Sequence, residues 1–425
     1  MKKKPSLSNE NMQSDYGRRN FVYGLFLGIL SFLTAFLFKK DSGFMRLQKN
    51  PDSQLANKAA QLNSMFINVL YPPSPLNALK GDGASENMTD VQAIFNSIQN
   101  TGGTVFFPKG TYKFSTTVNV YDGTTILGGG KKPTNGQPTI LDFTAITGEN
   151  AGIYMNDASD VNLKDFYLYG TQTGSGNDIS LAGNCRRINI ENIILNTKTT
   201  GNGIGTGESL IGSKWSNIVV VGAGTGFYLS PASTSTSLYN CYANACTNFG
   251  FNIQGTYCSL YSCGADSNAH YGYVVKNGNQ VGLYSCGGEG NGREAILLIN
   301  ATGIDVLSFR SVSNNSGASG FYPSFMDIQN SNQILLSNCQ DSSPNSATSF
   351  SLTSTTEDSG SRITIINPNF AKPINSRLLN VPRIDGAFYP STLAATNAQN
   401  NSIFIDLADG KLKFKDKSGT VNLLY

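Results

Sequence analysis

The chain has 425 residues, of which 39% are hydrophobic and 14% are charged, and 45 are glycine. A chain of this length can bury a large core, and its high glycine content favours turns over long helices. The net charge of +3, without a basic run interleaved with aromatic residues, argues against a nucleic-acid partner. A single histidine and the lack of a Cys-x-x-Cys pair argue against a structural zinc site.

Residues 21–38 are 18 positions without a charge, bordered by an arginine pair and a lysine pair. This length is just sufficient to cross a bilayer, so the segment predicts a transmembrane anchor or an export signal. Arg18 and Arg19 begin a stretch that resembles a twin-arginine signal, but no small-x-small cleavage motif follows closely, which favours an uncleaved anchor. We expect residues 1–20 to be a cytoplasmic basic tail, and the polar remainder to lie outside the cytoplasm, held at the cell membrane or secreted.

Residues 41–78 are expected to form a helical linker. Leu55, Ala59, Leu62, Phe66 and Val69 are spaced by four and three residues, which predicts a short helix with one apolar side. Two heptads do not specify a coiled coil. A helix lying against the rest of the chain or the membrane surface and a trimeric stalk therefore both remain open.

Residues 79–138 contain a glycine-rich block. In chain order it comprises Gly81-Asp82-Gly83, a helical pattern with Val91, Ile94, Phe95 and Ile98, the run GGTVFFPKGTY over residues 102–112, and Leu127-Gly128-Gly129-Gly130. The block closely resembles the N-terminal part of pectate-lyase-superfamily proteins, which include polygalacturonase-related enzymes and phage tail spikes. The resemblance implies a right-handed parallel β-helix whose open end is capped by the helix. Glu86-Asn87-Met88 departs from the family pattern, which commonly has an acidic pair there.

A short phrase recurs over residues 139–380, which we expect to be the rungs of this β-helix. Leu238-Tyr239-Asn240-Cys241 returns twice, at spacings of 22 and 23 residues. This period predicts a solenoid. Alternating apolar pairs such as Phe251 with Ile253 and Tyr273 with Val275, together with the near absence of helical spacing, predict that the rungs consist of strands, so the expected fold class is all-β. The cysteine position extends to a column of eight inward residues, each preceded by a short polar residue at a bend between two strands: Phe166, Ile193, Ile218, Cys241, Cys263, Cys286, Val312 and Cys339.

The chain has seven cysteines, four of which fall in this column. Stacked rungs lie about 4.8 Å apart, and a disulfide also needs side chains that converge. We therefore expect the cysteines to be buried as small hydrophobic residues rather than paired.

Two files of polar residues keep the same register. Three positions after the column stand Asn244, Asp266 and Glu289, and seven positions after it stand Asn248, His270 and Arg293. We expect all six in the turns that lead from the third strand of a rung to the next rung. Asn244 and Asn248 are candidate substrate-binding residues there.

The predicted catalytic residues are Asp266, Glu289, His270, Arg293 and Asp327. Two carboxylates about 5 to 5.5 Å apart suit a retaining glycosidase, and roughly 6.5 to 9.5 Å suits an inverting one. Arg293 could hold an acidic sugar, His270 could titrate near neutral pH, and Asp327 is expected to line the same cleft with Glu289 as its partner. The alternative is that Asp266 and Glu289 are solvated turn residues paired with Arg293.

Two neighbouring features carry open alternatives. Glu294 is expected in an ion pair rather than in the chemistry. Tyr239, Tyr261 and Tyr284 form an aromatic ladder that either stacks on sugars, with Tyr261 and Tyr284 as substrate-binding residues, or packs under loops.

Residues 381–425 are expected to form a separate β unit of three strands, Ile403–Leu407, Lys411–Lys415 and Thr420–Leu424. They would cap the last rung or pair across subunits, and the resemblance to spikes implies a homotrimer.

Function is expected to follow one of two courses. The chain is an exported or membrane-anchored enzyme that cuts a polysaccharide, as a glycoside hydrolase or a polysaccharide lyase, or it is a non-catalytic β-helix that binds glycans as a surface spike. The polygalacturonase motifs do not occur in full, so that activity is not transferred. No cofactor is predicted for a hydrolase, whereas a lyase could use Ca²⁺.

Overall fold

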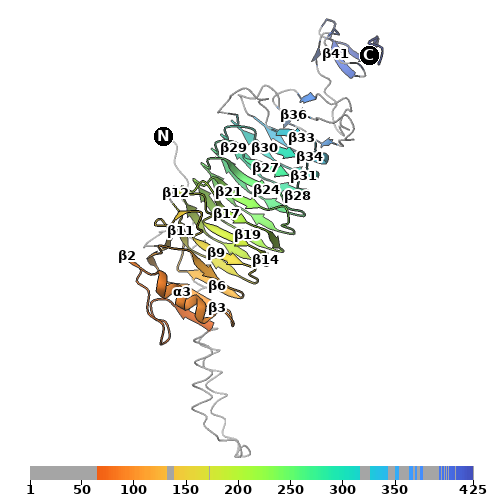
Figure 1. Ribbon diagram of the computed structural model, residues 1–425. Helices are drawn as coiled ribbons and strands as arrows, with labels where there is room; N and C mark the ends of the chain where they lie inside the picture. The colour runs from red at the N-terminus through yellow and green to blue at the C-terminus, as the bar shows by residue number, and fades with distance from the viewer. Residues whose placement is uncertain are drawn as a thin grey trace, which may run out of the picture. The chain divides into compact units, whose positions relative to one another are not determined.

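The computed structural model describes residues 65–131, 138–171, 173–315 and 326–342, and shorter stretches between residues 350 and 424. These residues form an all-β parallel β-helix with one helix, and the predicted right-handed fold is confirmed (Figure 1). Each rung contributes one short strand to each of three sheets, here called A, B and C.

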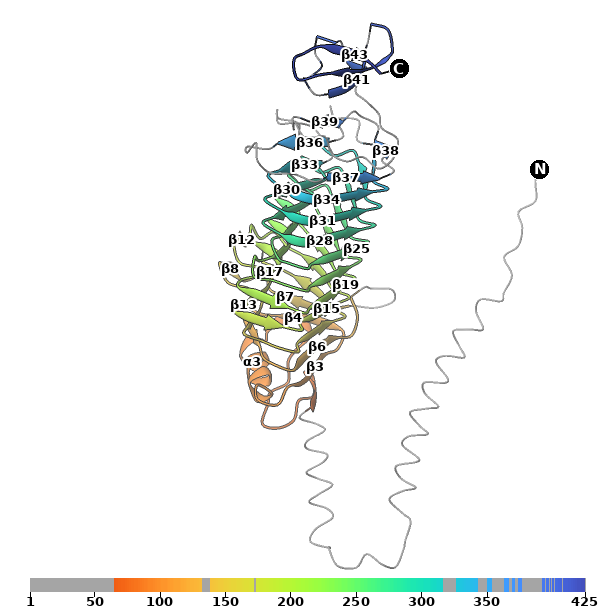
Figure 2. The same ribbon diagram turned by 90° about the vertical axis from the view of Figure 1, so that its right-hand side faces the viewer.

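Sheet A contains the first strand of each rung: β1 (Phe66–Asn68), β3 (Gly103–Phe107), β6 (Thr124–Gly128), β10 (Asn162–Lys164), β15 (Asn189–Glu191), β19 (Lys214–Ser216), β22 (Ser237–Tyr239), β25 (Ser259–Tyr261), β28 (Asn279–Tyr284), β31 (Thr302–Leu307), β34 (Asn332–Ser337) and β37 (Ile363–Ile366). Figure 2 shows β25, β28, β31 and β34 stacked along the solenoid.

Sheet B contains the second strand of each rung: β2 (Asp82–Glu86), β4 (Gly110–Lys113), β7 (Thr139–Asp142), β11 (Tyr167–Tyr169), β16 (Ile194–Asn196), β20 (Val219–Val221), β23 (Tyr242–Asn244), β26 (Gly264–Asp266), β29 (Gly287–Glu289), β32 (Arg310–Val312), β35 (Gln340–Asp341) and β38 (Asn369–Phe370).

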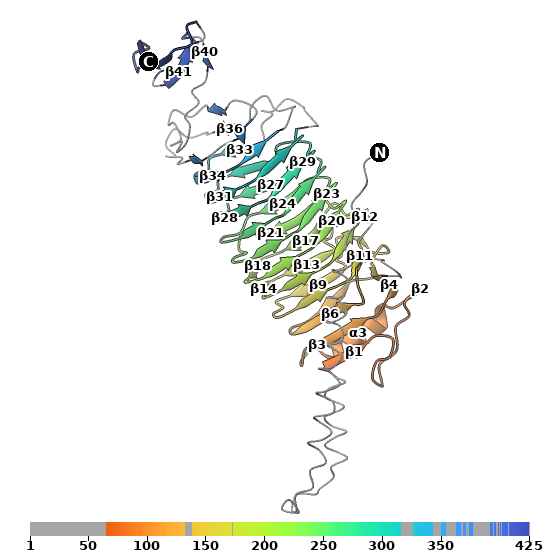
Figure 3. The ribbon, with the colours of Figure 1, turned by 180° about the vertical axis from the view of Figure 1, so that it is seen from behind.

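Sheet C completes the rungs: β5 (Val118–Val120), β9 (Ile153–Asn156), β13 (Ile179–Ala182), β17 (Asn202–Thr206), β21 (Thr225–Leu229), β24 (Phe249–Ile253), β27 (Tyr273–Lys276), β30 (Ile296–Ile299), β33 (Met326–Gln329), β36 (Phe350–Thr353) and β39 (Ile374–Ser376). Figure 3 shows β17, β21, β24 and β27 of this sheet with β20 and β23 of sheet B beside them. Two small parallel pairs flank the sheets: β8 (Thr147–Gly148) with β12 (Thr173–Gly174), and β14 (Asn184–Arg186) with β18 (Ser209–Ile211).

The bend between sheets A and B is a single residue with positive φ. Asn240, Ser262 and Ser285 have φ of 50°, 52° and 52°, and the next residue in each case is a buried cysteine. Short polar side chains tolerate this left-handed conformation. They also form hydrogen bonds between neighbouring rungs, as when Nδ2 of Asn192 donates to Oδ1 of Asp165 at 3.1 Å. The predicted column is thereby confirmed over these rungs.

One rung of the predicted column was wrong. Ser308, with φ of 56°, forms the bend after β31, and the buried residue that follows it is Phe309. The sequence Arg310-Ser311-Val312 imitates the same polar-to-apolar pattern three residues later, but Val312 lies half-buried on β32. The predicted column was therefore three residues too late at this rung.

The solenoid core consists of stacked like residues. The rings of Phe227, Phe251 and Tyr273 lie parallel, with centroids 4.8 and 4.9 Å apart. All seven cysteines are buried and free, as predicted. Stacking of identical side chains lets each rung reuse the packing of its neighbour.

The turns between sheets B and C are held by a buried asparagine ladder. The Nδ2 of Asn268 donates to Oδ1 of Asn291 at 2.8 Å, and the Nδ2 of Asn291 donates to Oδ1 of Asn314 at 2.7 Å. The same amides donate to the main-chain oxygens of Ala243 and Ala265. These bonds tie the turns to main-chain oxygens of the sheet B strands β23 and β26, and they fix the turns that carry the site described below.

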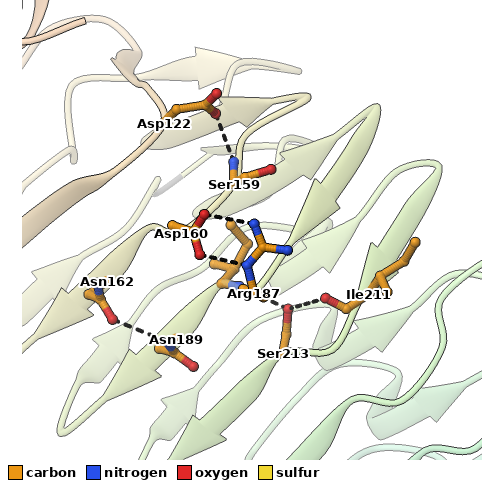
Figure 4. A network of polar contacts seen from close by, with 9 residues as sticks. Asp122, Ser159, Asp160, Asn162, Arg187, Asn189, Ile211 and Ser213 are labelled. Carbon is orange, nitrogen blue, oxygen red and sulfur yellow. Dashed lines mark hydrogen bonds and ion pairs between the residues drawn. The ribbon is translucent and has the colours of Figure 1, made fainter. Parts of the chain in front are cut away.

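Polar contacts between rungs also tie the opposite corner, where sheet C leads to sheet A (Figure 4). Arg187 donates through Nε and Nη2 to the two carboxylate oxygens of Asp160, at 2.6 and 2.7 Å. Asn189 donates to Asn162 at 3.1 Å. The ion pair is exposed, so water screens it and its contribution to stability is small.

The N-terminal cap is α3 (Met88–Ser97), which buries Val91, Ile94 and Phe95. The main-chain N–H of Asn119 on β5 donates to Oε1 of Gln92 at 2.9 Å, so the helix covers the first strand of sheet C. This confirms the capping role that the resemblance implied.

The prediction of a helical linker over residues 41–78 was wrong for the part that the structure describes. Residues 66–68 form β1, which pairs in parallel with β3, because Phe66, Ile67 and Asn68 extend sheet A by one strand. The predicted helix residues Leu55, Ala59 and Leu62 lie outside the described residues, as do the basic tail and residues 21–38. Within the described residues, no helix has both the length and the hydropathy to span a bilayer.

The C-terminal unit contains the three predicted strands, β41 (Ser402–Asp406), β42 (Leu412–Lys415) and β43 (Val421–Leu423), as an antiparallel sheet. A short strand, β40 (Thr392–Leu393), pairs in parallel with β41. Gly410 and Gly419 adopt φ of 67° and 88° at the two hairpin turns, where a side chain would be strained.

Candidate functional site

The predicted site residues separate into two groups, one at the ends of the sheet B strands and one in the turns to sheet C and on β33. Asn244, Asp266 and Glu289 are the last residues of β23, β26 and β29, and they pair directly from rung to rung. Their stacking was predicted, but their position was not, because they lie at the end of sheet B rather than in the turn that follows the third strand. Their outward direction follows from the buried alanines Ala243 and Ala265 that precede two of them.

The carboxylate of Asp266 is engaged within the fold. Tyr242 donates its hydroxyl to Oδ2 of Asp266 at 2.5 Å, and the backbone N–H of Glu289 donates to Oδ1 at 3.1 Å. The Tyr242 ring lies over Gly264, where an added Cβ would come within 2.7 Å of it. Burial, followed by the contact with Asp266, raises the pKa of Tyr242 to about 12. Asp266 thus fastens three rungs together on sheet B.

The second group lies in the turns from sheet B to sheet C. The backbone N–H of His270 donates to the oxygen of Asn248 at 3.0 Å, and that of Arg293 donates to the oxygen of His270 at 2.9 Å. The three residues are therefore neighbours from rung to rung, as their spacing predicted, but the predicted position was wrong because these turns precede the third strand of the rung. His270 is half-buried, and its ring meets Phe249 edge-on, with centroids 6.5 Å apart.

Tyr271 joins this group although sequence reasoning passed over it. Nη1 of Arg293 donates to its hydroxyl at 3.1 Å, and the guanidinium carbon lies 5.6 Å from the ring centroid. Burial raises the pKa of Tyr271, and the hydrogen bond from Arg293 opposes that shift. The Arg293 guanidinium thus fixes the position of the Tyr271 hydroxyl.

Glu294 differs most from its expected role. Its side chain is only 5% exposed, and among the described residues no ion pair joins it to Arg293. Burial raises the pKa of Glu294 to about 7, and the nearby Asp327 raises it further while Arg293 opposes the shift. This carboxyl therefore exchanges its proton close to neutral pH.

Asp327 completes the group from β33, where it is 6% exposed. Its Oδ2 accepts a hydrogen bond from Nε2 of Gln329 at 2.7 Å. Its acidic neighbour is Glu294 on the C side, whereas the partner predicted for it, Glu289, lies at the end of a sheet B strand. We call His270, Tyr271, Arg293, Glu294 and Asp327 the sheet C cluster.

One signal in the sequence would have found the missing residues. Phe249, Tyr271 and Glu294 each stand eight positions after a column cysteine, one position beyond the file that contains His270 and Arg293. Backbone bonds from Gly250 to Tyr271 and from Gly272 to Glu294 show that these positions are stacked.

The tyrosine ladder of sheet A is formed. The rings of Tyr239, Tyr261 and Tyr284 lie with centroids 4.9 Å apart and interplanar angles of 7° and 21°. All three are half-buried on the outer face, and Nζ of Lys214 lies 5.3 Å from the Tyr239 centroid. Tyr261 uses both faces of its ring within the ladder, so only its edge and hydroxyl remain for a ligand.

No group of three or more His, Cys, Asp or Glu side chains in the described part of the chain is arranged to hold a metal ion.

A family model described as rhamnogalacturonase A/epimerase, pectate lyase-like, matches residues 77–256. Among solved structures, the chain is similar to the A-module of the mannuronan C-5 epimerase AlgE4 of Azotobacter vinelandii, with a TM-score of 0.57 and 16% identity over 76% of this chain and 100% of that one.

It is also similar to the pre-mature gene product 12 of bacteriophage phi29, with a TM-score of 0.60 and 15% identity over 75% of this chain and 47% of that one. The enzymatically active domain of tailspike protein 2 of bacteriophage CBA120 gives a TM-score of 0.51 and 12% identity over 78% of this chain and 57% of that one. No curated protein sequence matches the chain. At these identities the likeness to solved structures concerns the fold alone, and the family model confirms the predicted resemblance to the pectate lyase superfamily over residues 77–256.

Proposed function

Because the chain carries a pectate-lyase-like β-helix domain, we propose that it modifies an acidic polysaccharide at the sheet C cluster, by removing the proton next to a uronate carboxylate. The fold supports this, since similar structures include a mannuronan epimerase and a tailspike domain named as enzymatically active. The observation that carries the proposal is the cluster itself, where the Arg293–Tyr271 pair adjoins the buried Glu294.

Each member of the cluster has a role that follows from its surroundings. Arg293 is cationic and partly exposed, so it binds the uronate carboxylate and stabilises the negative charge that develops on it. Burial raises the pKa of Glu294 to about 7, and in its ionised form it accepts the proton from C5. Tyr271 keeps its proton, because burial raises its pKa, and donates it.

Two products follow from the same proton abstraction. If Tyr271 gives its proton to the leaving glycosidic oxygen, the C4–O bond breaks and an unsaturated uronate forms. If C5 is instead reprotonated from the opposite face, the sugar is epimerised and the chain stays intact. His270 stands beside Tyr271 and is the residue that would return the proton to the cluster between turnovers.

The experiment uses the full chain with a panel of uronate-containing and neutral polysaccharides. Unsaturated products are followed by absorbance, epimerisation by proton NMR in D₂O, and hydrolysis by reducing ends. We expect turnover only on uronate-containing substrates and its loss in Glu294→Gln. The matched control is Glu289→Gln, which makes the same change five residues earlier on sheet B. If Glu289→Gln lost its activity while Glu294→Gln kept it, the site would instead be the predicted pair of Asp266 and Glu289.

Glycoside hydrolysis is the second candidate, because Glu294 and Asp327 are a carboxyl pair whose charges disfavour each other. In that reaction Glu294 would act as a protonated acid, so activity would fall as pH rises through about 7. Proton abstraction requires the ionised form and predicts the opposite slope. Binding of glycans without any turnover would favour the non-catalytic surface protein instead.

Calcium and location are part of the proposal. A lyase reaction that depends on added Ca²⁺, and is lost on chelation, would require oxygen ligands beyond Glu294 and Asp327. We further propose that residues 21–38 hold the β-helix at the cell membrane, outside the cytoplasm. Protease treatment of intact cells, followed by blotting for the C-terminus, tests this placement.

A further inference from the structure

The tyrosine ladder of sheet A ends differently on its two sides. At the end nearer the N-terminus, Lys214 pairs directly with Ser237 on the neighbouring strand, and its Nζ lies 5.3 Å from the centroid of the Tyr239 ring. A cation over an aromatic face is attracted by the negative charge of that face. This end of the ladder is therefore stabilised by a cation of the protein itself.

At the other end an acid takes the position of the lysine. The Tyr284 ring lies over Gly282, where an added Cβ would collide with it, and Gly282 pairs directly with Asp305 on the next strand, β31 (Figure 2). Asp305 therefore stands beside Tyr284 as Lys214 stands beside Tyr239. Because the face of an aromatic ring is negative, it attracts a cation and does not attract a carboxylate.

The carboxylate of Asp305 is half-buried and unpaired. Among the described residues it forms neither an ion pair nor a hydrogen bond. On its far side it pairs directly with Leu335, which offers no polar group. Burial raises the pKa of Asp305, and the pKa of Tyr284 is raised by burial and then by the nearby Asp305. An acid held between an aromatic ring and a leucine costs free energy that a bound cation would offset.

Neutral hydroxyl groups line the rest of the ladder. The hydroxyls of Ser237 and Ser259 and those of the three tyrosines are partly exposed, and none has a hydrogen-bond partner in the described part of the chain. Each can donate and accept, as sugar hydroxyls do. A peptide could not add a strand here, because β25, β28 and β31 are each paired on both sides. The surface therefore favours a sugar over a peptide as the carrier of a cation.

We propose that Asp305 and Tyr284 form a binding site for the ammonium group of an amino sugar within a polysaccharide. The ammonium group pairs with the carboxylate and lies against the ring, as Nζ of Lys214 lies against Tyr239. The sugar hydroxyls contact the hydroxyl groups along the ladder. This site lies on sheet A and shares no residue with the sheet C cluster, so it is independent of the proposed catalytic function.

The test measures binding to the full-length protein in a non-denaturing detergent by isothermal titration calorimetry. The probes are a glucosamine tetramer at a slightly acidic pH that keeps its amines protonated, the neutral N-acetylated tetramer, and tetralysine. We expect only the glucosamine tetramer to bind. Asp305→Asn keeps the size of the side chain and removes its charge, so it should weaken binding at least about tenfold. Tyr284→Leu should weaken it roughly threefold, and Tyr284→Phe, which keeps the ring, should not.

The matched control is Glu191→Gln, which removes the same charge from the outer face of the same sheet, at an acid that already pairs with Lys164 at 3.5 Å. It should leave the affinity unchanged, and equal weakening in Glu191→Gln and Asp305→Asn would overturn the site. Unchanged affinity in Asp305→Asn, equal binding of the acetylated tetramer, or no binding of any probe would overturn it as well. Tighter binding of tetralysine would contradict the assignment to an amino sugar. Circular dichroism of each variant confirms that its fold is kept.

Discussion

The two corners on either side of sheet B differ in how much the conformation and length of the turn vary from rung to rung. Between sheets A and B the chain turns at one residue of positive φ, and a buried apolar residue follows. Between sheets B and C the turns differ in length and carry His270, Tyr271, Arg293 and Glu294. The constant corner fixes the register of the solenoid. The variable corner, tied from inside by asparagines, leaves its outward positions free for chemistry.

Replacement of Glu294 gives the largest expected effect and tests whether the variable corner carries function. We expect Glu294→Gln to lower kcat/KM on the active polysaccharide by about 100-fold or more, because a positioned general base contributes roughly 10² to 10⁴. Activity of the wild type should rise with pH through about 7, since the base must lose its proton. Steady-state rates between pH 5 and 9 measure both.

Glu289→Gln is the control for this change and should retain activity and the same pH profile. A profile that falls through pH 7 would indicate that Glu294 acts as an acid. If Glu294→Gln showed the same dependence of rate on pH as the wild type, Glu294 would not be the catalytic base.

Removal of one rung of the asparagine ladder tests how the variable corner is held. Asn291 donates to Ala265 and Asn314, and its Oδ1 accepts from the main chain and side chain of Asn268. Asn291→Ala removes the side-chain partner of the buried Asn268 N–H and of the Ala265 oxygen, at about 1–3 kcal/mol each, so we expect a loss of roughly 4 kcal/mol in the free energy of unfolding. Chemical denaturation measures it.

Asn252→Ala is the matched control, because Asn252 is half-buried on sheet C and accepts one bond from Gln254. It should cost less than about 1 kcal/mol. Equal losses in the two variants would mean that the ladder does not stabilise this corner beyond ordinary packing.

A buried acid in an earlier turn gives a smaller, pH-dependent effect. Asp178 is fully buried, its Oδ1 accepts from the N–H of Thr171 at 2.9 Å, and its Oδ2 has no hydrogen-bond partner among the described residues. Burial raises its pKa to about 7, so the folded protein keeps a proton that the unfolded chain releases from about pH 4 upward. Its stabilising contribution is therefore full at low pH and lost as pH rises from about 4 to 7.

Asp178→Asn should remove this dependence, because an amide does not titrate. We expect the difference in unfolding free energy between wild type and variant to change by on the order of 2 kcal/mol between pH 5 and 7. Comparison of the two proteins cancels the titration of Glu294 and of all other shared groups. Parallel curves for wild type and variant would show that Asp178 does not titrate in this interval.

The contrast between corners also explains what the sequence could predict. The column from Phe166 to Cys286 was predictable because burial selects similar residues at each rung. The prediction was wrong only at the next rung, where it chose Val312 in place of the buried Phe309. The stacking of Asp266 on Glu289 followed from the same register. The raised pKa of Glu294 did not, because it depends on the burial of the turn before β30 and on the charge of Asp327 from the next rung.

The tyrosine ladder gives the smallest expected effect and tests the regular side of the comparison. Tyr261 is stacked between Tyr239 and Tyr284, so Tyr261→Ala breaks two ring contacts, each worth about 0.5–1.5 kcal/mol. We expect a loss of roughly 2 kcal/mol or less in unfolding free energy and no change in kcat/KM, because the faces of the rings are used within the ladder. A fall in glycan affinity at unchanged stability would instead assign Tyr261 to substrate binding, and the regular side of the rung would then share in function.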